Sequence, residues 1–225
     1  MGTAQRSCRM NSTEVRSQAE TQALPGWRVV TCAVLEQELM SWPGRFAYGV
    51  EFVFLPSNLD LSFSHLERAL DRTLNQLQGN GPADSVLVLY GQCHPDIQKI
   101  VTRGGARLLS LGNCYELLLG KEKYREHLAA GTYFVLPQWA SYWDKIFTRK
   151  LGFTPELGGI FFPEMHRQAV YLDTGFVYRS RFDRSAFEKF TRLPVMIQKV
   201  DLGELYARLD ACFANLETEN VVHTF

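Results

Sequence analysis

Three cysteines occupy equivalent positions beside predicted β-strands. Cys32 ends the β-branched run "WRVVTC", Cys93 follows the apolar run "SVLVLY", and Cys114 comes just after "ARLLSLG". Loops at the carboxyl ends of parallel strands share one rim of a sheet, so we expect the three sulfurs to meet there. Thiolates bind soft cations such as zinc and the irons of iron–sulfur clusters. The pattern predicts a metal site with these three cysteines as ligands.

The spacing of the cysteines leaves a simpler interpretation open. The sequence contains no C-x-x-C pair, and cysteine at a strand end often serves as a small buried apolar residue. Helices that begin after these strands would favour thiolates through their partial positive charge. The remaining cysteines, Cys8 in the polar N-terminal segment and Cys212 on the apolar face of the last predicted helix, are expected to lie outside any site.

Several neighbouring side chains are predicted to act on a bound species. His94 directly follows the middle cysteine; it is a candidate fourth ligand, an acid–base group or a contact at a helix start, since a turn relaxes the strand alternation. Tyr90 is a second candidate for proton transfer, or a core aromatic residue with a hydrated hydroxyl. Asn113 and Tyr115 flank the third cysteine and are predicted to hydrogen bond a bound cofactor.

Carboxylates also follow two of the predicted strands. Glu36 lies one helical turn after Cys32 and can face either the same site or, more commonly, solvent. Asp173 and Thr174 close the run "QAVYLDT". Asp173 is either a carboxylate that orients a ligand or a turn former before Gly175.

The chain alternates strand-like and helix-like segments from Trp27 onward. Strands are predicted in "WRVVTCAV", "AYGVEFVFLP", "SVLVLYG", "ARLLSLG", "TYFVLP", "QAVYLDTG" and "PVMIQKVDLG", most of them followed by a helical pattern. Residues 113–131 are predicted to form one helix, and residues 138–152 an aromatic-rich helix. Residues 154–167 are expected to form a loop over the sheet edge. The alternation favours parallel strands joined by right-handed crossovers. It predicts one Rossmann-like three-layer α/β domain with a mainly parallel sheet over residues 26–225, after a disordered tail at 1–25.

Composition excludes several classes of protein. Lys plus Arg and Asp plus Glu are equal at 24 each, so no net field favours nucleic acid or an anionic membrane. No apolar stretch approaches the roughly 20 residues of a spanning helix, and the N-terminus lacks an apolar signal core. We therefore expect a cytoplasmic protein. No glycine-rich phosphate loop or dinucleotide-binding motif is present.

The segments around the cysteines resemble a known family. The ordered strings "TCAVLEQEL", "VLYGQCHP", "GNCYELLLGKEKY", "GTYFVLPQW", "VYLDTG" and "DLGELYARL" are similar to the family catalogued as domain of unknown function 1638. The resemblance extends from Arg28 to Leu209. It implies that the cysteines of the family motifs correspond to Cys32, Cys93 and Cys114.

The resemblance also implies a biological context. Many members occur in bacteria and archaea together with corrinoid-dependent methyltransferase systems for methylamines and related methyl donors. This chain departs from the family at one motif, since His94 and Pro95 stand where members commonly have Gly-Asn. Because these residues directly follow Cys93, the departure affects which group would be the fourth metal ligand and which substrate would bind.

Three functions remain open on the sequence alone. The first is an enzyme or accessory factor of corrinoid-linked methyl transfer, in which zinc activates a small thiol substrate; the corrinoid, or a methyltransferase, would then be on a partner, because the D-x-H-x-x-G pattern is absent. The second is a [4Fe–4S] protein with an open coordination position, acting in redox, reactivation or lyase chemistry. The third is a non-catalytic binding or delivery module.

Overall fold

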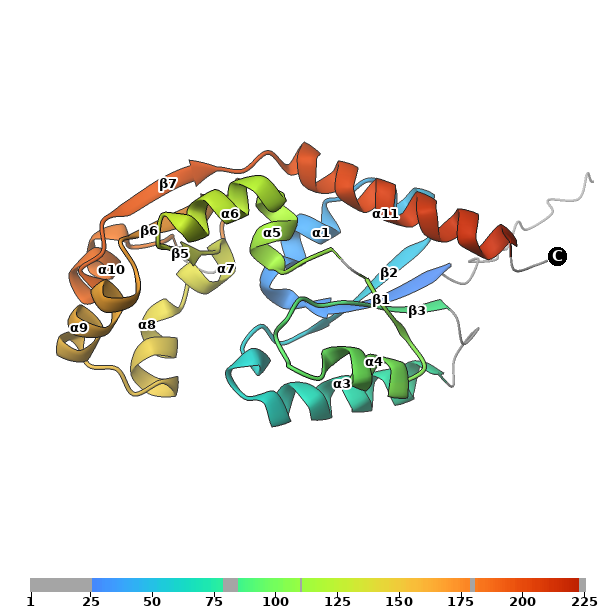
Figure 1. Cartoon of the computed structure of the whole chain (residues 1–225), viewed down its shortest axis with the longest axis horizontal. Coiled ribbons are helices and arrows are strands. Elements are labelled where there is room, and N and C mark those ends of the chain that lie inside the picture. Colours follow the sequence, from blue (N-terminus) through green and yellow to red (C-terminus); the bar gives the residue numbers. More distant parts are fainter. Residues whose placement is uncertain (1–25, 79–84, 110, 179–180, 223–225) are drawn as a thin grey trace, which may run out of the picture.

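The strands form two separate parallel sheets (Figure 1). This computed structural model describes residues 26–78, 85–109, 111–178 and 181–222. The first sheet has the order β2-β1-β3-β4, with bounds β1 (Trp27–Cys32), β2 (Val50–Leu55), β3 (Val86–Leu89) and β4 (Arg107–Leu108). The second has the order β5-β6-β7, with bounds β5 (Thr132–Val135), β6 (Gln168–Asp173) and β7 (Val195–Lys199). Every strand pair is parallel.

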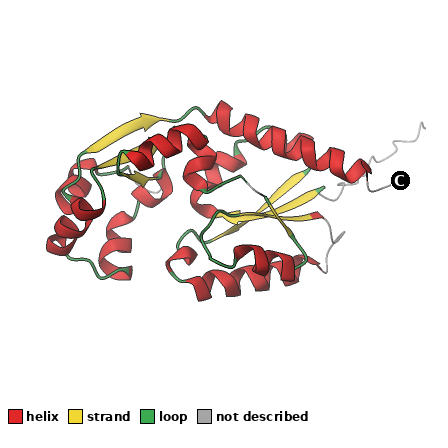
Figure 2. Ribbon diagram, viewed as in Figure 1, coloured by secondary structure: helices red, strands yellow, loops and turns green. Residues whose placement is uncertain are grey.

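Helices cover both faces of the first sheet (Figures 1 and 2). The helices of the first half are η1 (Ala33–Leu35), α1 (Glu36–Met40), α2 (Gly44–Ala47), η2 (Leu59–Leu61), α3 (Phe63–Gln78), α4 (Ile97–Arg103) and α5 (Cys114–Leu119). Those that follow are α6 (Lys121–Ala129), α7 (Pro137–Ala140), α8 (Trp143–Lys145), η4 (Ile146–Lys150), α9 (Pro155–Met165), α10 (Arg184–Thr191) and α11 (Leu202–Val222). The helix α11 returns from the second half to pack on the first sheet (Figure 1).

The part of the molecule built on the first sheet, called here the first half, has a core on each face of that sheet, because the side chains of β1 alternate between the two faces. Consecutive strand residues face opposite sides of a sheet, so Val29 and Val30 are both buried but in different layers. Val30 belongs to the layer that contains Leu66, Leu70 and Leu74 of α3. Val29 belongs to the layer that contains Leu205, Leu209 and Phe213 of α11. Each of these side chains contributes roughly 1.5–3 kcal/mol by leaving water.

The α/β class and the parallel pairing predicted from the sequence are confirmed. The division of the strands between two sheets was not apparent from the local patterns. The predicted tail, residues 1–25, lies outside the described residues, and the assignment of 26–225 to one domain stays a prediction. Within the described part of the chain, no helix combines the length and apolar composition needed to cross a membrane.

Residues 154–167, expected to form a loop, contain α9 instead. The side chain of Thr154 accepts a hydrogen bond from the Leu157 N–H at 3.2 Å, and Pro155 occupies the first turn. Both features are helix start signals. Both are visible in the sequence, although Pro163 and two glycines inside the same stretch disfavour a helix.

Two predicted helices are interrupted. The helix expected after Asn113 divides at Gly120, whose φ of 78° ends α5 before α6 begins. The aromatic-rich helix expected over 138–152 consists of the short turns α7, α8 and η4. The first break fixes the length of α5, which begins at Cys114.

Candidate functional site

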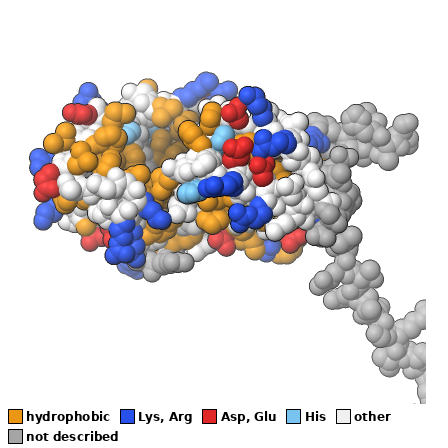
Figure 3. Space-filling view, turned by 90° about the horizontal axis from the view of Figure 1, so that it is seen from below, with side chains coloured by type: hydrophobic (Ala, Val, Ile, Leu, Met, Phe, Trp, Pro, Cys, Tyr) orange, Lys and Arg blue, Asp and Glu red, His pale blue; other side chains and the backbone are white. Residues whose placement is uncertain are grey.

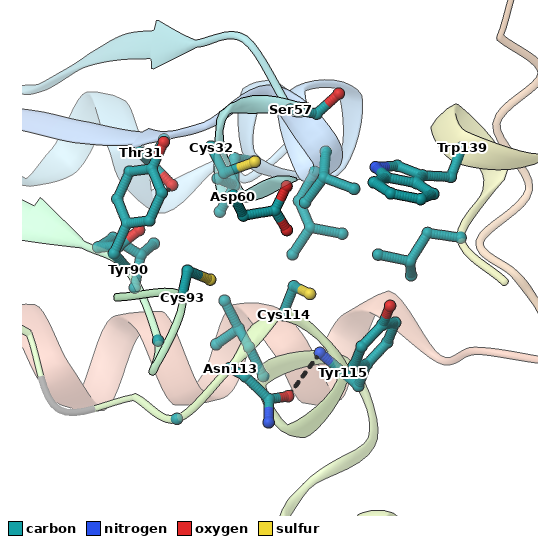
Figure 4. Close-up of a pocket in the computed structure, with 18 of the residues that line it drawn as sticks. Thr31, Cys32, Ser57, Asp60, Tyr90, Cys93, Asn113, Cys114, Tyr115 and Trp139 are labelled. Carbon is teal, nitrogen blue, oxygen red and sulfur yellow. Dashed lines mark hydrogen bonds between the residues drawn. The ribbon is translucent and has the colours of Figure 1, made fainter. Parts of the chain in front are cut away.

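One cavity of about 170 Å³ is lined by all three predicted metal ligands. Cys32 ends β1, Cys93 lies in the loop after β3, and Cys114 begins α5, which follows β4. Figure 4 shows their sulfur atoms bordering a common space. The part of the molecule built on the second sheet, called here the second half, closes the cavity with residues that include Tyr133 and Trp139. The three cysteines are thus brought together at the carboxyl edge of the first sheet.

The sulfurs border the cavity without meeting at one point. Among the residues that the structure describes, no group of three His, Cys, Asp or Glu side chains is arranged to hold a single metal ion. A zinc site places each sulfur about 2.3 Å from a common centre. In an iron–sulfur cluster each cysteine binds a different iron, so its sulfurs stand further apart. By residue type, three thiols suit either kind of group.

Burial keeps the thiols protonated when no cation is bound. It raises the pKa of the Cys32 thiol to about 12, despite a backbone hydrogen bond from Val34 that acts in the opposite direction. Burial also raises the pKa values of Cys93 and Cys114. The N–H groups of Val34 and Tyr115 at the helix starts lower the pKa of Cys32 and Cys114, as expected, but desolvation is the larger effect. A metal would bind here with release of protons.

Asp60 lies in the same cavity and was not among the predicted site residues. It belongs to η2, which follows β2, and its carboxylate points into the space that the three sulfurs border (Figure 4). The residue as a whole is exposed, but desolvation of the carboxyl group raises its pKa. The only sequence signal was its position after a strand whose carboxyl end shares this edge of the sheet.

Tyr90 lines the cavity next to Cys32. Its side chain is only 6% exposed, and its hydroxyl oxygen has no described partner at ordinary hydrogen-bond geometry except a weak contact with the Cys32 thiol. Burial is the main cause that raises the pKa of this phenol, followed by the adjacent cysteines. A buried hydroxyl with so weak a partner is unusual, and it can serve a bound molecule as donor or acceptor. Its predicted role in proton transfer stays a prediction.

His94 does not line the cavity. Its Nδ1 atom accepts a hydrogen bond from the Asp96 N–H at 3.0 Å, and its ring packs edge-on against Phe63 with centroids 5.3 Å apart. Asp96 is the residue that precedes α4. The position matches the third alternative for His94, a contact at a helix start. Its roles as ligand or acid–base group stay predictions without support from this geometry.

Asn113 and Tyr115 line the cavity, but their polar contacts are largely internal. The Asn113 side chain caps α5 by accepting hydrogen bonds from the N–H groups of Tyr115 and Glu116, at 3.0 and 2.9 Å. Its amide also donates to the Tyr124 hydroxyl at 2.8 Å. The Tyr115 ring stacks on Phe134 with centroids 4.8 Å apart. Asn113 therefore positions the cysteine that follows it, and its contact with a cofactor stays a prediction.

The carboxylates at the other strand ends lie outside the cavity. Glu36 is exposed and borders a wider groove of about 1160 Å³ beside it. Asp173 accepts a hydrogen bond from the Gly175 N–H at 3.0 Å, as a turn former would. The surface is hollowed between the two halves, with hydrophobic side chains within the hollow (Figure 3).

A buried carboxylate joins the two halves next to this groove. Glu38 of α1 has no exposed surface, and it accepts hydrogen bonds from Thr174 at 2.6 Å and Tyr178 at 2.7 Å. Desolvation raises the pKa of Glu38, although the two hydroxyls partly offset it. Thr174, which was considered only as part of a strand end, is thus a contact between the halves.

Comparison with known proteins gives one result. A family model described as "Protein of unknown function (DUF1638)" matches residues 54–209. The matched range includes Asp60, Cys93 and Cys114, and it begins after Cys32. No curated protein and no solved structure matches the chain.

Proposed function

The chain belongs to the family described as protein of unknown function (DUF1638), and we propose that its three cysteines hold an iron–sulfur cluster with one open coordination position. The observation that supports a cluster is the arrangement of the sulfurs. Cys32, Cys93 and Cys114 line one cavity, and Figure 4 shows their sulfur atoms around a common space. Three cysteines leave the fourth iron of a [4Fe–4S] cluster without a cysteine ligand.

The residues of the chain have distinct tasks in this proposal. Cys32, Cys93 and Cys114 would hold the cluster, which when bound supplies an iron able to coordinate a substrate or partner group. The apolar walls, among them Leu136 and Trp139, limit the access of water to the site. The Tyr90 hydroxyl offers a hydrogen-bond donor or acceptor that is already desolvated and lies beside Cys32. These tasks suit redox, reactivation or lyase chemistry on a small molecule.

The size of the cavity limits what can react there. Pockets for drug-sized ligands measure roughly 300–1,000 Å³, and this cavity measures about 170 Å³. A corrinoid would therefore have to remain on a partner protein.

The groove of about 1160 Å³ beside the cavity favours one competing function. In this second function, the same three cysteines hold zinc in the cavity, and the zinc activates a small thiol. The thiol then receives a methyl group from a corrinoid protein bound at the groove.

Metal and sulfide analysis separates these functions. The full-length chain is purified without oxygen, and iron, zinc and acid-labile sulfide are measured per chain in wild type, Cys93→Ser and the control Cys212→Ser. We expect iron and sulfide in equal amounts in wild type and Cys212→Ser, and their loss in Cys93→Ser with an unchanged circular dichroism spectrum. Zinc without sulfide, lost in Cys93→Ser, would overturn the cluster and support thiol activation. Neither metal nor sulfide would leave a non-catalytic binding module.

A further inference from the structure

The strand β7 forms an open edge of the second sheet. It stands last in the order β5-β6-β7, and among the described strands it pairs with β6 alone. Figure 1 shows it along the outer side of the molecule. Met196 and Ile197 are 51% and 57% exposed, and consecutive strand residues face opposite sides of a sheet. Apolar surface is therefore exposed on both faces of an edge that can pair with another strand.

The backbone groups that point away from β6 belong to alternate residues of β7. The Pro194 carbonyl accepts a hydrogen bond from the N–H of a β6 residue, and the Val200 N–H donates to the carbonyl of another, both at 2.9 Å. The N–H and C=O of one strand residue point to the same side. Even-numbered residues of β7 thus face β6, and the outward groups belong to Val195, Ile197 and Lys199.

These outward groups are complementary to a second copy of themselves. Glu188 of α10 already accepts a hydrogen bond from the Val195 N–H at 2.9 Å. In an antiparallel pair with a two-fold axis at Ile197, the two Ile197 residues exchange two hydrogen bonds. Each Lys199 N–H then meets the Val195 carbonyl of the other copy, so the pairing uses only groups that point outward.

Charge favours the antiparallel direction. Lys199 lies opposite Val195 of the second copy in this register, and both side chains are on the face where Val195 packs with residues of α10. Glu188 of α10 holds its carboxylate at that point of the edge, so each Lys199 ammonium comes beside Glu188 of the other copy. A parallel pair would instead bring the two Lys199 side chains together, and like charges oppose each other.

The side chains nearest the two-fold axis are apolar. Ile197 lies directly opposite Ile197 of the second copy, and Met196 lies opposite Gln198, whose side chain contacts His127 of α6 at 2.8 Å. Removal of this apolar surface from water favours association. A strand of five residues is a small contact beside the roughly 800 Å² per partner of stable complexes. We therefore expect a reversible dimer, with a Kd on the order of 10 µM.

We propose that two copies of the chain form a symmetric dimer in which their β7 strands pair antiparallel about Ile197. The two three-stranded sheets then become one continuous six-stranded sheet. A second copy fits this edge because one strand supplies the register, the apolar contact and the charge pair to both sides. No residue of β7, which the structure describes throughout, lines the cavity or the groove, so the dimer is independent of the proposed function.

Sedimentation equilibrium of the full-length chain under reducing conditions, from about 1 to 200 µM, measures the association. We expect a monomer–dimer equilibrium in wild type. Ile197→Lys places like charges at the two-fold axis and should raise the Kd at least about tenfold. Ile197→Pro removes an outward N–H, a position where an edge strand tolerates proline, and should do the same. Phe46→Lys, at a residue of α2 that is 75% exposed, is the control and should leave the Kd unchanged.

Disulfide formation tests the register. Directly opposite residues in a hydrogen-bonded antiparallel pair have Cα atoms about 5.5 Å apart, a separation that a disulfide spans. Ile197→Cys should therefore link two chains on mild oxidation. The two copies of Met196 are diagonal neighbours about 7–8 Å apart, so Met196→Cys should link far fewer chains. Wild type, which keeps its five cysteines, gives the background.

Three results would overturn the proposal. The first is a wild-type chain that stays monomeric up to about 200 µM, well above the expected Kd. The second is a dimer whose Kd is unchanged in Ile197→Lys, the variant that decides if Ile197→Pro loses its native circular dichroism spectrum. The third is linking of Met196→Cys that equals or exceeds that of Ile197→Cys. None of these results bears on metal or sulfide content, which tests the proposed function separately.

Discussion

The Oγ atom of Ser57 and the Oη atom of Tyr142 lie 2.6 Å apart and form a hydrogen bond between the two halves of the molecule. Ser57 follows β2 and lines the cavity, whereas Tyr142 lies between α7 and α8. Tyr142 donates to the Gln138 side chain at 3.1 Å, which in turn donates to the Ala33 carbonyl at 2.8 Å. This chain of hydrogen bonds ties the halves together beside Cys32.

Tyr142→Phe tests the strength of this connection. The substitution leaves the Ser57 hydroxyl, only 7% exposed, without its acceptor, so we expect the free energy of unfolding to fall by about 1–2 kcal/mol. The control is Tyr206→Phe, which removes a bond of equal length to Ser41 on the surface and should change stability by less than about 0.5 kcal/mol. Urea unfolding measures both, and equal effects would contradict a buried connection.

Glu38→Gln should flatten the dependence of stability on pH. Because the folded pKa of Glu38 is raised above the ordinary value of 4.5, the folded state holds a proton that the unfolded state has already released. The contribution of Glu38 is therefore fully present below about pH 4.5 and is lost as pH rises through the folded pKa. The glutamine variant has no such loss, so its stability relative to wild type should improve with rising pH. Unfolding free energies at several pH values check this, and parallel curves would contradict it.

The cavity cysteines should be slow to alkylate in metal-free protein. With the pKa of Cys32 raised to about 12 and that of a free thiol near 8.5, its thiolate fraction at about pH 8 is roughly three orders of magnitude below that of an unfolded chain. Chelator-treated, reduced protein is treated with iodoacetamide, and the modified sites are followed by mass spectrometry. The same chain in denaturant is the reference. Rapid native modification of Cys32 would show that the thiolate is favoured after all.

Asn113→Ala should destabilise the start of α5. It removes a cap with two N–H hydrogen bonds, and loss of such a cap costs about 1 kcal/mol and up to about 2 kcal/mol. Asn113→Asp keeps the accepting oxygen and loses only the donation to Tyr124, so it should retain most of the stability. Thermal unfolding of both variants measures the loss of the cap. If Asn113 instead acts by contact with a cofactor, Asp and Ala should lower the amount of bound metal equally, which metal analysis of the two variants would show.

The local sequence was sufficient to indicate which edge of the sheet carries the cysteines. A strand pattern ends at Cys32 and another ends just before Cys93, and the alternation with helices requires parallel strands, so both residues must emerge at the same edge. Cys114 follows by the same reasoning, since β4 pairs in parallel with β3. Strand direction is a property of local pattern and connection length, which is why this part was predictable.

The tertiary structure alone decided which side chains face one another across that edge. Asp60 enters the cavity because β2 lies beside β1 and η2 turns its carboxylate inward, while His94 turns away to meet Phe63 and the start of α4. Neither orientation follows from residue type or spacing, since each depends on contacts with segments distant in sequence. The separation of β5, β6 and β7 into a second sheet has the same origin, and α7, which follows β5, brings Trp139 into the wall of the cavity.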